Sequence, residues 1–192
     1  MSRPTKYHDL LDAAEIIVRR DGSSSLTLDA VAAEAGVSKG GLLYHFPSKD
    51  ALIAAMVERM VDRASVAHEN AMLADSAGPG SWTRAWVRTS VSGDGPSVND
   101  TTAAGLLAAV ATHPALADPM RARYSEWRGK AEADGLPGEV ASIVMLAADG
   151  LWMADVLGLS APTGPERGRI IAALMALASP TPIGVAATEA SP

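Results

Sequence analysis

Apolar residues recur along the chain at the three- and four-residue spacing of amphipathic helices, in a series of stretches separated by Gly, Pro and Ser. No run of useful length alternates apolar with polar residues, as a half-buried strand would. The fold class is therefore predicted to be all-α, with about nine helices. The expected helices cover residues 5–20, 27–36, 38–45, 49–72, 82–92, 99–113, 118–133, 139–157 and 167–178.

Two short helices near the N-terminus are joined by a glycine turn. Thr27 is suited to cap the first and Ser38 the second, with Gly36 supplying the turn between them. Pro47 forces the chain out of the helix, and Ser48 can cap the next one. A short helix, a Gly turn and a second, basic short helix together predict a helix-turn-helix.

The second short helix and its flanks carry side chains that suit a DNA groove. Lys39 can reach a phosphate or a guanine edge, and Lys49 begins the following helix beside the backbone. Tyr44 and His45 offer hydrogen bonds near the groove wall, although a core position is the alternative for Tyr44. The predicted DNA-binding residues are Thr27, Ser38, Lys39, Gly40, Gly41, Leu42, Tyr44, His45 and Lys49.

Four adjacent residues set how closely this helix can approach DNA. Gly40 and Gly41 remove side-chain bulk and loosen a short helix by about 1 kcal/mol. Leu42 is expected to contact a thymine methyl, whereas Leu43 is expected to pack inward.

The run LTLDAVAAEAGVSKGGLLYHFPSKDAL, residues 26–52, resembles the TetR-type (TetR/AcrR) transcriptional regulators. The resemblance implies a DNA-binding domain over residues 1–47 and a ligand-binding and dimerisation domain over 48–178. Residues 179–192 are rich in Pro, Ala and Thr and are expected to form a flexible tail. It also implies that Thr27 and the free amides behind it meet a DNA phosphate; a plain helix cap is the alternative. Gly41 departs from the commonest family pattern, which often has Thr, Ala or Ser there.

The last two expected helices have more apolar surface than one chain can easily cover. Residues 139–157 are apolar almost all round, and residues 167–178 carry a second apolar stripe. Pairing with a second copy in a four-helix bundle would bury both, as the resembled family does; an interior hairpin is the alternative. The predicted dimer-interface residues are Val144, Leu151, Ile171, Leu174 and Met175.

A ligand pocket is predicted among the remaining helices, because Trp and Met side chains line adaptable apolar sites. Asp149 lies inside an otherwise apolar helix, and a buried carboxylate needs a partner or a cationic ligand. Pairing with Arg84, Arg88 or Arg128 is the alternative. The surrounding residues 146–152 also resemble, weakly, the C-terminal part of multidrug-responsive regulators of this type. The predicted ligand-binding residues are Met72, Trp86, Trp127, Met145, Asp149 and Trp152.

Composition narrows the class of protein. The chain has 192 residues, 48% of them hydrophobic and 20% charged, which is typical of a globular protein. It has no cysteine, and its polar start lacks an apolar signal core, so a cytoplasmic location without membrane contact is expected. The net charge of −6 lies mostly beyond residue 63: residues 1–63 carry eight basic and nine acidic side chains.

The leading hypothesis is a homodimeric repressor that leaves a palindromic DNA operator when a small hydrophobic or cationic effector binds. A helical small-molecule-binding or adaptor protein without DNA binding is the alternative. An enzyme is not expected, because the four histidines are scattered and neither a zinc-protease spacing nor a Gly-x-Ser-x-Gly elbow occurs. No cofactor or metal is expected either, since the Gly-x-Gly at residues 93–95 lacks the third glycine of a dinucleotide site.

Overall fold

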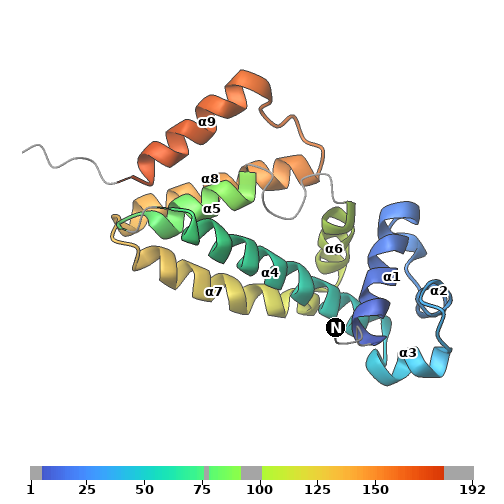
Figure 1. Ribbon diagram of the computed structural model, residues 1–192. Coiled ribbons are helices and arrows are strands. Elements are labelled where there is room, and N and C mark those ends of the chain that lie inside the picture. The colour runs from blue at the N-terminus through green and yellow to red at the C-terminus, as the bar shows by residue number, and fades with distance from the viewer. Residues whose placement is uncertain (1–5, 76–77, 92–100, 180–192) are drawn as a thin grey trace, which may run out of the picture.

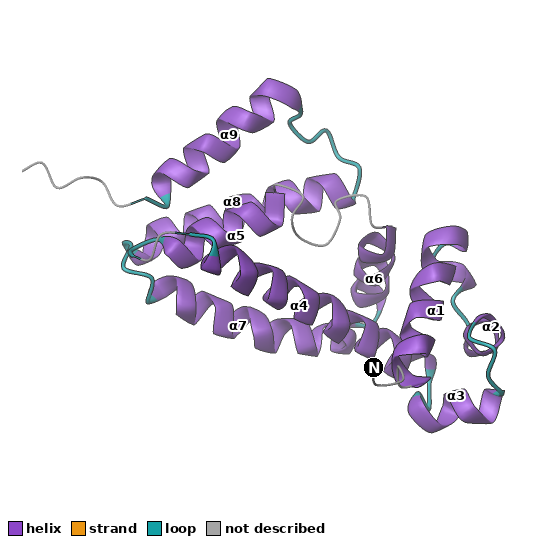
Figure 2. Cartoon of the chain, viewed as in Figure 1, coloured by secondary structure: helices purple, strands orange, loops and turns teal. Residues whose placement is uncertain are grey.

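The computed structural model describes residues 6–75, 78–91 and 101–179, and these are helical with no strand among them (Figures 1 and 2). The all-α prediction is confirmed. The helices are α1 (Lys6–Asp21), α2 (Leu28–Glu34), α3 (Lys39–His45), α4 (Lys49–Leu73), α5 (Ser81–Val91), α6 (Thr101–Thr112), α7 (Asp118–Glu132), α8 (Gly138–Val156) and α9 (Gly164–Leu177). Two short 3-10 turns, η1 (Ser23–Ser25) and η2 (Pro114–Ala117), lie between them.

Helices α1 to α3 form a small module at one end of the molecule (Figure 1). Side-chain caps begin three of the first four helices: Thr27, Ser38 and Ser48 each accept a 3.1 Å hydrogen bond from the backbone amide three residues on. Gly36 adopts a φ of 64°, which only glycine takes without strain, and turns the chain from α2 to α3. The predicted starts of α2, α3 and α4 are therefore confirmed.

The core of this module corrects the predicted roles of two leucines. Leu42 is 0% exposed and packs with Leu10, Leu52 and Phe46, so its side chain cannot reach a thymine methyl. Leu43, predicted to point inward, is 39% exposed. The two neighbours lie about 100° apart on the helix, and tertiary packing rather than local pattern decides which one is buried.

Helix α4 joins the module to the rest of the chain (Figure 1). Its first half contributes Leu52, Ile53 and Met56 to the N-terminal core, and Val61 belongs to a second core built with α5, α7, α8 and α9. The predicted domain boundary at residue 48 is not tested by this packing and stays a prediction. None of the described helices is long and apolar enough to cross a membrane.

Helix α6 packs directly on the N-terminal module. A Cβ added to Gly105 would lie 2.9 Å from Cγ1 of Val18 in α1 and 3.1 Å from Cβ of Ser23 in η1, so the helices approach as closely as glycine allows. Leu106 is buried in the N-terminal core beside them. The expected stop at His113 and Pro114 is confirmed, although η2 follows before α7.

Other helix ends differ from the expected ones for local reasons. Helix α7 begins at Asp118 as expected, with Ala117 at the N-cap, and Asp118 pairs with Arg121 in the first turn. Helix α9 begins at Gly164 rather than Arg167, because Pro165 fits the first turn of a helix. The Gly-x-Gly at residues 93–95, the expected start of a helix at residue 99 and nearly all of the tail lie outside the described residues.

The C-terminal end of α9 is locked to the start of α5. Arg84 donates to the carbonyl oxygens of Ala178 and Pro79 and forms an ion pair with Asp75. Gly80, at φ 81°, sits so close that a Cβ there would lie 1.9 Å from the Ala178 oxygen. Asp134 also caps α5, accepting from the Trp82 and Thr83 amides.

Candidate DNA-binding surface and ligand pocket

Helix α3 presents an exposed polar surface at the end of the molecule. Tyr44 is 86% exposed, which overturns the alternative that it belongs to the core. Lys39 and Lys49 are exposed at the starts of α3 and α4, and Gly40 is exposed between them. Thr27 and Ser38 lie nearby at the exposed N-termini of α2 and α3. Of the nine predicted DNA-binding residues, Leu42 is the one whose burial removes it from this surface.

Lys39 is already paired on this surface. Its Nζ lies 2.9 Å from Oδ1 and 3.1 Å from Oδ2 of Asp29, in the first turn of α2. Both side chains are more than half exposed, so the pair is held weakly and can exchange for a phosphate. Sequence reasoning missed Asp29, although its place in the first turn of α2 is a recognisable signal.

The ring of His45 packs against neighbouring aromatic rings and is not fully exposed. Its ring lies edge-on to Tyr44 at 5.1 Å and to Tyr7 of α1 at 6.2 Å, measured between centroids. It is therefore half-buried, and it supports the base of the exposed Tyr44. Gly41 is also half-buried. A Cβ at Gly41 would lie 3.4 Å from Oγ of Ser38, so the missing side chain leaves room for the Ser38 cap.

The second candidate site is a cavity of about 240 Å³ enclosed by α4, α5, α6, α7 and α8. It brings together four of the six predicted ligand-binding residues. The cavity is lined by Met60, Val61, Ala64, Trp86, Thr89, Ser90, Leu107, Met120, Tyr124, Trp127, Asp149, Trp152 and Met153. Tyr124, Met120 and Met60 were missed; Tyr124 lies three residues before Trp127 on one helix face, a spacing that could have indicated it.

Met72 and Met145 were predicted to line this cavity and do not. Met145 is buried in the second core, one turn before Asp149 on the same face of α8, and Met72 packs against the edge of that core near the end of α4. Both residues have the right chemistry and a helical spacing that fits. Whether they line the cavity depends on how α4, α5 and α8 pack together, which the pattern of a single helix does not contain.

Asp149 is the one carboxylate among the described residues that line this cavity. Its Oδ1 accepts a 3.0 Å hydrogen bond from the indole Nε1 of Trp86, and its Oδ2 is buried without a hydrogen-bond partner among the described residues. Burial raises the pKa of Asp149 from 3.8 to about 6, against the opposing effect of the Trp86 hydrogen bond. A protein cation close by would lower that pKa.

The arginine partners considered for Asp149 bind other acids. Arg84 and Arg88 both pair with Asp75, at 2.9 and 3.1 Å, and Arg128 lies 3.5 Å from Glu132. The alternative of an internal ion pair with one of them is therefore wrong. Asp149 faces the cavity with an indole N–H as its neighbour.

Aromatic rings continue from the cavity into the core. Trp86 stacks on Trp82 at 5.3 Å and meets Trp127 at 4.9 Å. Trp82 in turn lies 4.4 Å from the ring of His68 on α4, whose pKa is lowered by burial. The cavity wall is thus continuous with a rigid stack that reaches α4.

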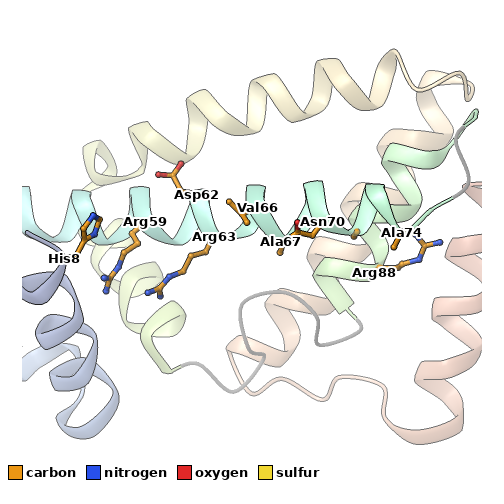
Figure 3. Close-up of a pocket in the computed structure, with 10 residues that line it drawn as sticks. His8, Arg59, Asp62, Arg63, Val66, Ala67, Asn70, Ala74 and Arg88 are labelled. Atoms are coloured by element: carbon orange, nitrogen blue, oxygen red, sulfur yellow. The ribbon is translucent and has the colours of Figure 1, made fainter. Parts of the chain in front are cut away.

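A larger, open groove of about 840 Å³ runs along the outer face of α4 (Figure 3). Its charged walls are already paired: Arg63 binds Glu15 of α1, Arg59 binds Asp12, and Arg88 binds Asp75. Because these charges are already paired and the groove is open to solvent, a ligand would find few free charged groups and little enclosure there. The smaller cavity is the better ligand site, because it combines enclosure, aromatic walls and an incompletely bonded carboxylate.

The exposed apolar residues of α8 and α9 differ from those predicted to form a dimer interface. Val144 and Leu174 are buried within their own chain, so they have almost no surface left for a partner. Leu151, Ile171 and Met175 are half-buried. Instead, Ile143 and Leu146 on α8 are 57% and 67% exposed, and Leu157 and Leu177 are also exposed at the ends of the two helices.

Two protein-family models match the chain, one at its N-terminal part and one at its C-terminal part. Residues 10–56 match the family model described as "Bacterial regulatory proteins, tetR family". Residues 80–179 match the model described as "Tetracyclin repressor-like, C-terminal domain", which by itself spans more than half of the chain. Both the α3 surface and much of the cavity lie within these matches.

Solved structures share the fold over nearly the whole chain. A transcriptional regulator of Streptomyces coelicolor A3(2) is 19% identical, with a TM-score of 0.71, over 92% of this chain and 100% of that one. A TetR-family regulator from Rhodococcus sp. is 21% identical, with a TM-score of 0.68, over 91% and 99%. The multidrug binding protein EbrR in complex with ethidium is 25% identical, with a TM-score of 0.65, over 92% and 99%.

Proposed function

The chain belongs to the TetR family of bacterial regulatory proteins, and from that premise we propose that it is a homodimeric repressor released from a palindromic operator by a small apolar or cationic ligand. Membership confirms the resemblance of residues 26–52 and makes the chain a DNA-binding transcriptional regulator. The proposal concerns four points: repression, the palindromic operator, the ligand, and the residues that bind the DNA and the ligand.

The observation that carries the ligand part is the partial hydrogen bonding of Asp149. A carboxylate with one buried, unbonded oxygen inside an aromatic cavity is costly unless something arrives to pair with it. The likeness to EbrR, a multidrug binding protein solved with ethidium, supports a ligand that is aromatic and positively charged. Trp86, Trp127 and Trp152 are proposed to contact its apolar part.

The DNA part assigns the exposed residues of the α3 surface. Tyr44 is proposed to enter the major groove, supported by His45, while Lys39, Lys49 and the N-terminal turns at Thr27 and Ser38 contact the phosphates. Gly40 and Gly41 leave room for close approach. A two-fold dimer would set two such surfaces one helical turn of DNA apart, roughly 34–36 Å.

Dimerisation is proposed through α8 and α9. The exposed apolar side chains of Ile143, Leu146, Leu157 and Leu177 lie along these two helices, and Leu151, Ile171 and Met175 flank them. Pairing them with a second copy would form a four-helix bundle.

Two helices connect the cavity to the DNA module. Helix α4 lines the cavity with Met60 and Val61 and begins at Lys49 beside the α3 surface. Helix α6 lines it with Leu107, while the adjacent Leu106 packs in the N-terminal core. A ligand that displaces either wall would move both modules of a dimer away from the spacing that DNA requires.

The test is binding of the full chain to a labelled duplex from its own upstream DNA, followed by fluorescence anisotropy at several salt concentrations. We expect specific binding whose affinity falls steeply with salt, and release by a small aromatic amine, N,N-dimethylbenzylamine, in the wild type but only weakly in Asp149→Asn. A flat salt response with retained amine binding would instead favour a helical small-molecule-binding protein.

A further inference from the structure

The two oxygens of Asp149 have different surroundings. Oδ1 accepts the indole N–H of Trp86 at 3.0 Å, whereas Oδ2 is buried and has no partner among the described residues. Buried polar atoms are nearly always hydrogen-bonded, so an orphaned carboxylate oxygen in a cavity wall marks the place of a missing donor. Asp149 lines the cavity, so a ligand held there is the nearest outside source of that donor.

The described residues of the cavity wall supply Asp149 Oδ2 with neither a hydrogen bond nor a countercharge. No Lys, Arg or His is among the described residues that line the cavity. The Thr89 hydroxyl is already used, since it donates to the Ala85 carbonyl within α5 at 3.0 Å. The hydroxyls of Ser90 and Tyr124 also line the cavity, but neither lies within hydrogen-bond distance of Oδ2. The positive charge therefore has to come with the ligand, and a donor on that ligand can supply the hydrogen that no described side chain gives to Oδ2.

The geometry points to a ligand that carries an N–H on a positive nitrogen, a protonated amine or an amidinium, and donates that hydrogen to Oδ2 of Asp149. This inference rests on the proposed ligand site and names the chemistry that the site selects. A neutral alcohol can donate a hydrogen bond to the carboxylate, but it brings no countercharge to offset the cost of burying that anion, so it is a poorer match. A quaternary ammonium ion has the charge and can stack on the indoles, but it has no hydrogen to donate.

The size of the cavity sets the scale of the ligand. Drug-sized ligands occupy pockets of about 300–1,000 Å³. At about 240 Å³ the cavity favours a smaller molecule, with one aromatic ring as the simplest choice. N,N-dimethylbenzylamine and benzyltrimethylammonium are a matched pair of probes, since they share the ring and the charge and differ by one methyl group in place of one N–H. Benzyl alcohol is the neutral comparator.

The experiment titrates the three probes into the full chain without DNA, using calorimetry and the fluorescence of the tryptophans that line the cavity. We expect the protonated amine to bind at least about tenfold more tightly than the quaternary ion, and benzyl alcohol to bind most weakly. In Asp149→Asn the ratio between the two cations should fall to about twofold or less. Glu139→Gln, which removes an exposed acid from the same helix, should leave the ratio unchanged.

Three results would overturn the inference: equal or tighter binding of the quaternary ion, a ratio that survives Asp149→Asn, or no detectable binding of either cation. Since no DNA is present, a failure of operator binding or of release would count against the proposed regulation and leave this result standing.

Discussion

The indole Nε1 of Trp86 donates a 3.0 Å hydrogen bond to Oδ1 of Asp149 and so joins α5 to α8 across the cavity. Trp86 is also stacked on Trp82, which contacts His68 of α4. A ligand cation that draws Asp149 toward itself would therefore disturb a ring that belongs to a stack reaching α4. The same hydrogen bond explains how an acid can be tolerated in an apolar helix without an arginine partner.

Replacing Asp149 with Asn should stabilise the chain at neutral pH. Because the pKa of Asp149 in the folded chain is about 6 rather than 3.8, its stabilising contribution is present below about pH 4 and is lost as the pH rises through about 6. That difference corresponds to at most about 3 kcal/mol of unfolding free energy. Urea unfolding should give similar stabilities for wild type and Asp149→Asn near pH 4, and a more stable variant at pH 7.5. A constant difference across this range would contradict the prediction; Glu139→Gln is the control.

The affinity for an amine should depend on pH in the opposite sense. A protonated amine binds the carboxylate form of Asp149, and that form increases as the pH rises through about 6. Calorimetric titration with N,N-dimethylbenzylamine should show binding about tenfold tighter at pH 7 than at pH 5. Tyr124 is the other titratable side chain that lines the cavity. The pH dependence should disappear in Asp149→Asn, and tighter binding at low pH would contradict the assignment.

Sequence patterns predicted local features well and contacts between helices poorly. Caps at Thr27, Ser38 and Ser48 depend on neighbouring residues, and all three form as expected. The predicted burial of Leu42 and Leu43 was reversed, because leucine suits a buried position at either place. Only packing on α1 and α4 decides which of the two is buried. Asp149 was recognisable as an acid in an apolar helix, but its donor lies on a helix 63 residues earlier in the chain. No spacing rule connects the two.

The contact between Gly80 and Ala178 should tolerate no side chain. A methyl group at Gly80 would lie 1.9 Å from the Ala178 carbonyl oxygen, in a backbone with φ 81° that already disfavours other residues. We expect Gly80→Ala to cost at least about 2 kcal/mol in urea unfolding and to loosen α9. Gly129→Ala is the matched control, since that helical glycine has nothing within 4 Å and should gain up to about 1 kcal/mol. Similar stabilities for both variants would argue against the locked α9 end.

The ion pair between Asp29 and Lys39 should restrain binding to non-operator DNA. Its 2.9 Å contact holds Lys39 away from phosphates, and an exposed pair is worth at most about 1 kcal/mol. Asp29→Asn is therefore expected to tighten binding to random duplex DNA by about twofold to fivefold per module, measured by anisotropy at fixed salt. Glu34→Gln is the matched control, because it also removes one negative charge from α2 but at a residue that pairs with Arg20 and not with Lys39. If the gain persists when Lys39→Ala is added, Asp29 acts by direct repulsion rather than through Lys39.

Substitution of Gly105 should shift the chain toward its ligand-bound form without contacting either the ligand or the DNA. An alanine methyl there would lie 2.9 Å from Val18 Cγ1 and 3.1 Å from Ser23 Cβ, so α6 has to shift away from the N-terminal module by a few tenths of an ångström. Leu107, on the same helix, lines the cavity, so the shift also reaches the ligand site. If α6 transmits the signal, Gly105→Ala should resemble the ligand-bound state and bind operator DNA about twofold to thirtyfold more weakly. Because linkage is reciprocal, the variant should also bind the amine more tightly and show a smaller further loss of DNA affinity on adding it. Gly129→Ala carries the same change of residue in an open helical position and should leave all three quantities unchanged. An unchanged operator affinity in Gly105→Ala, at unchanged folding, would leave α4 as the sole proposed connection.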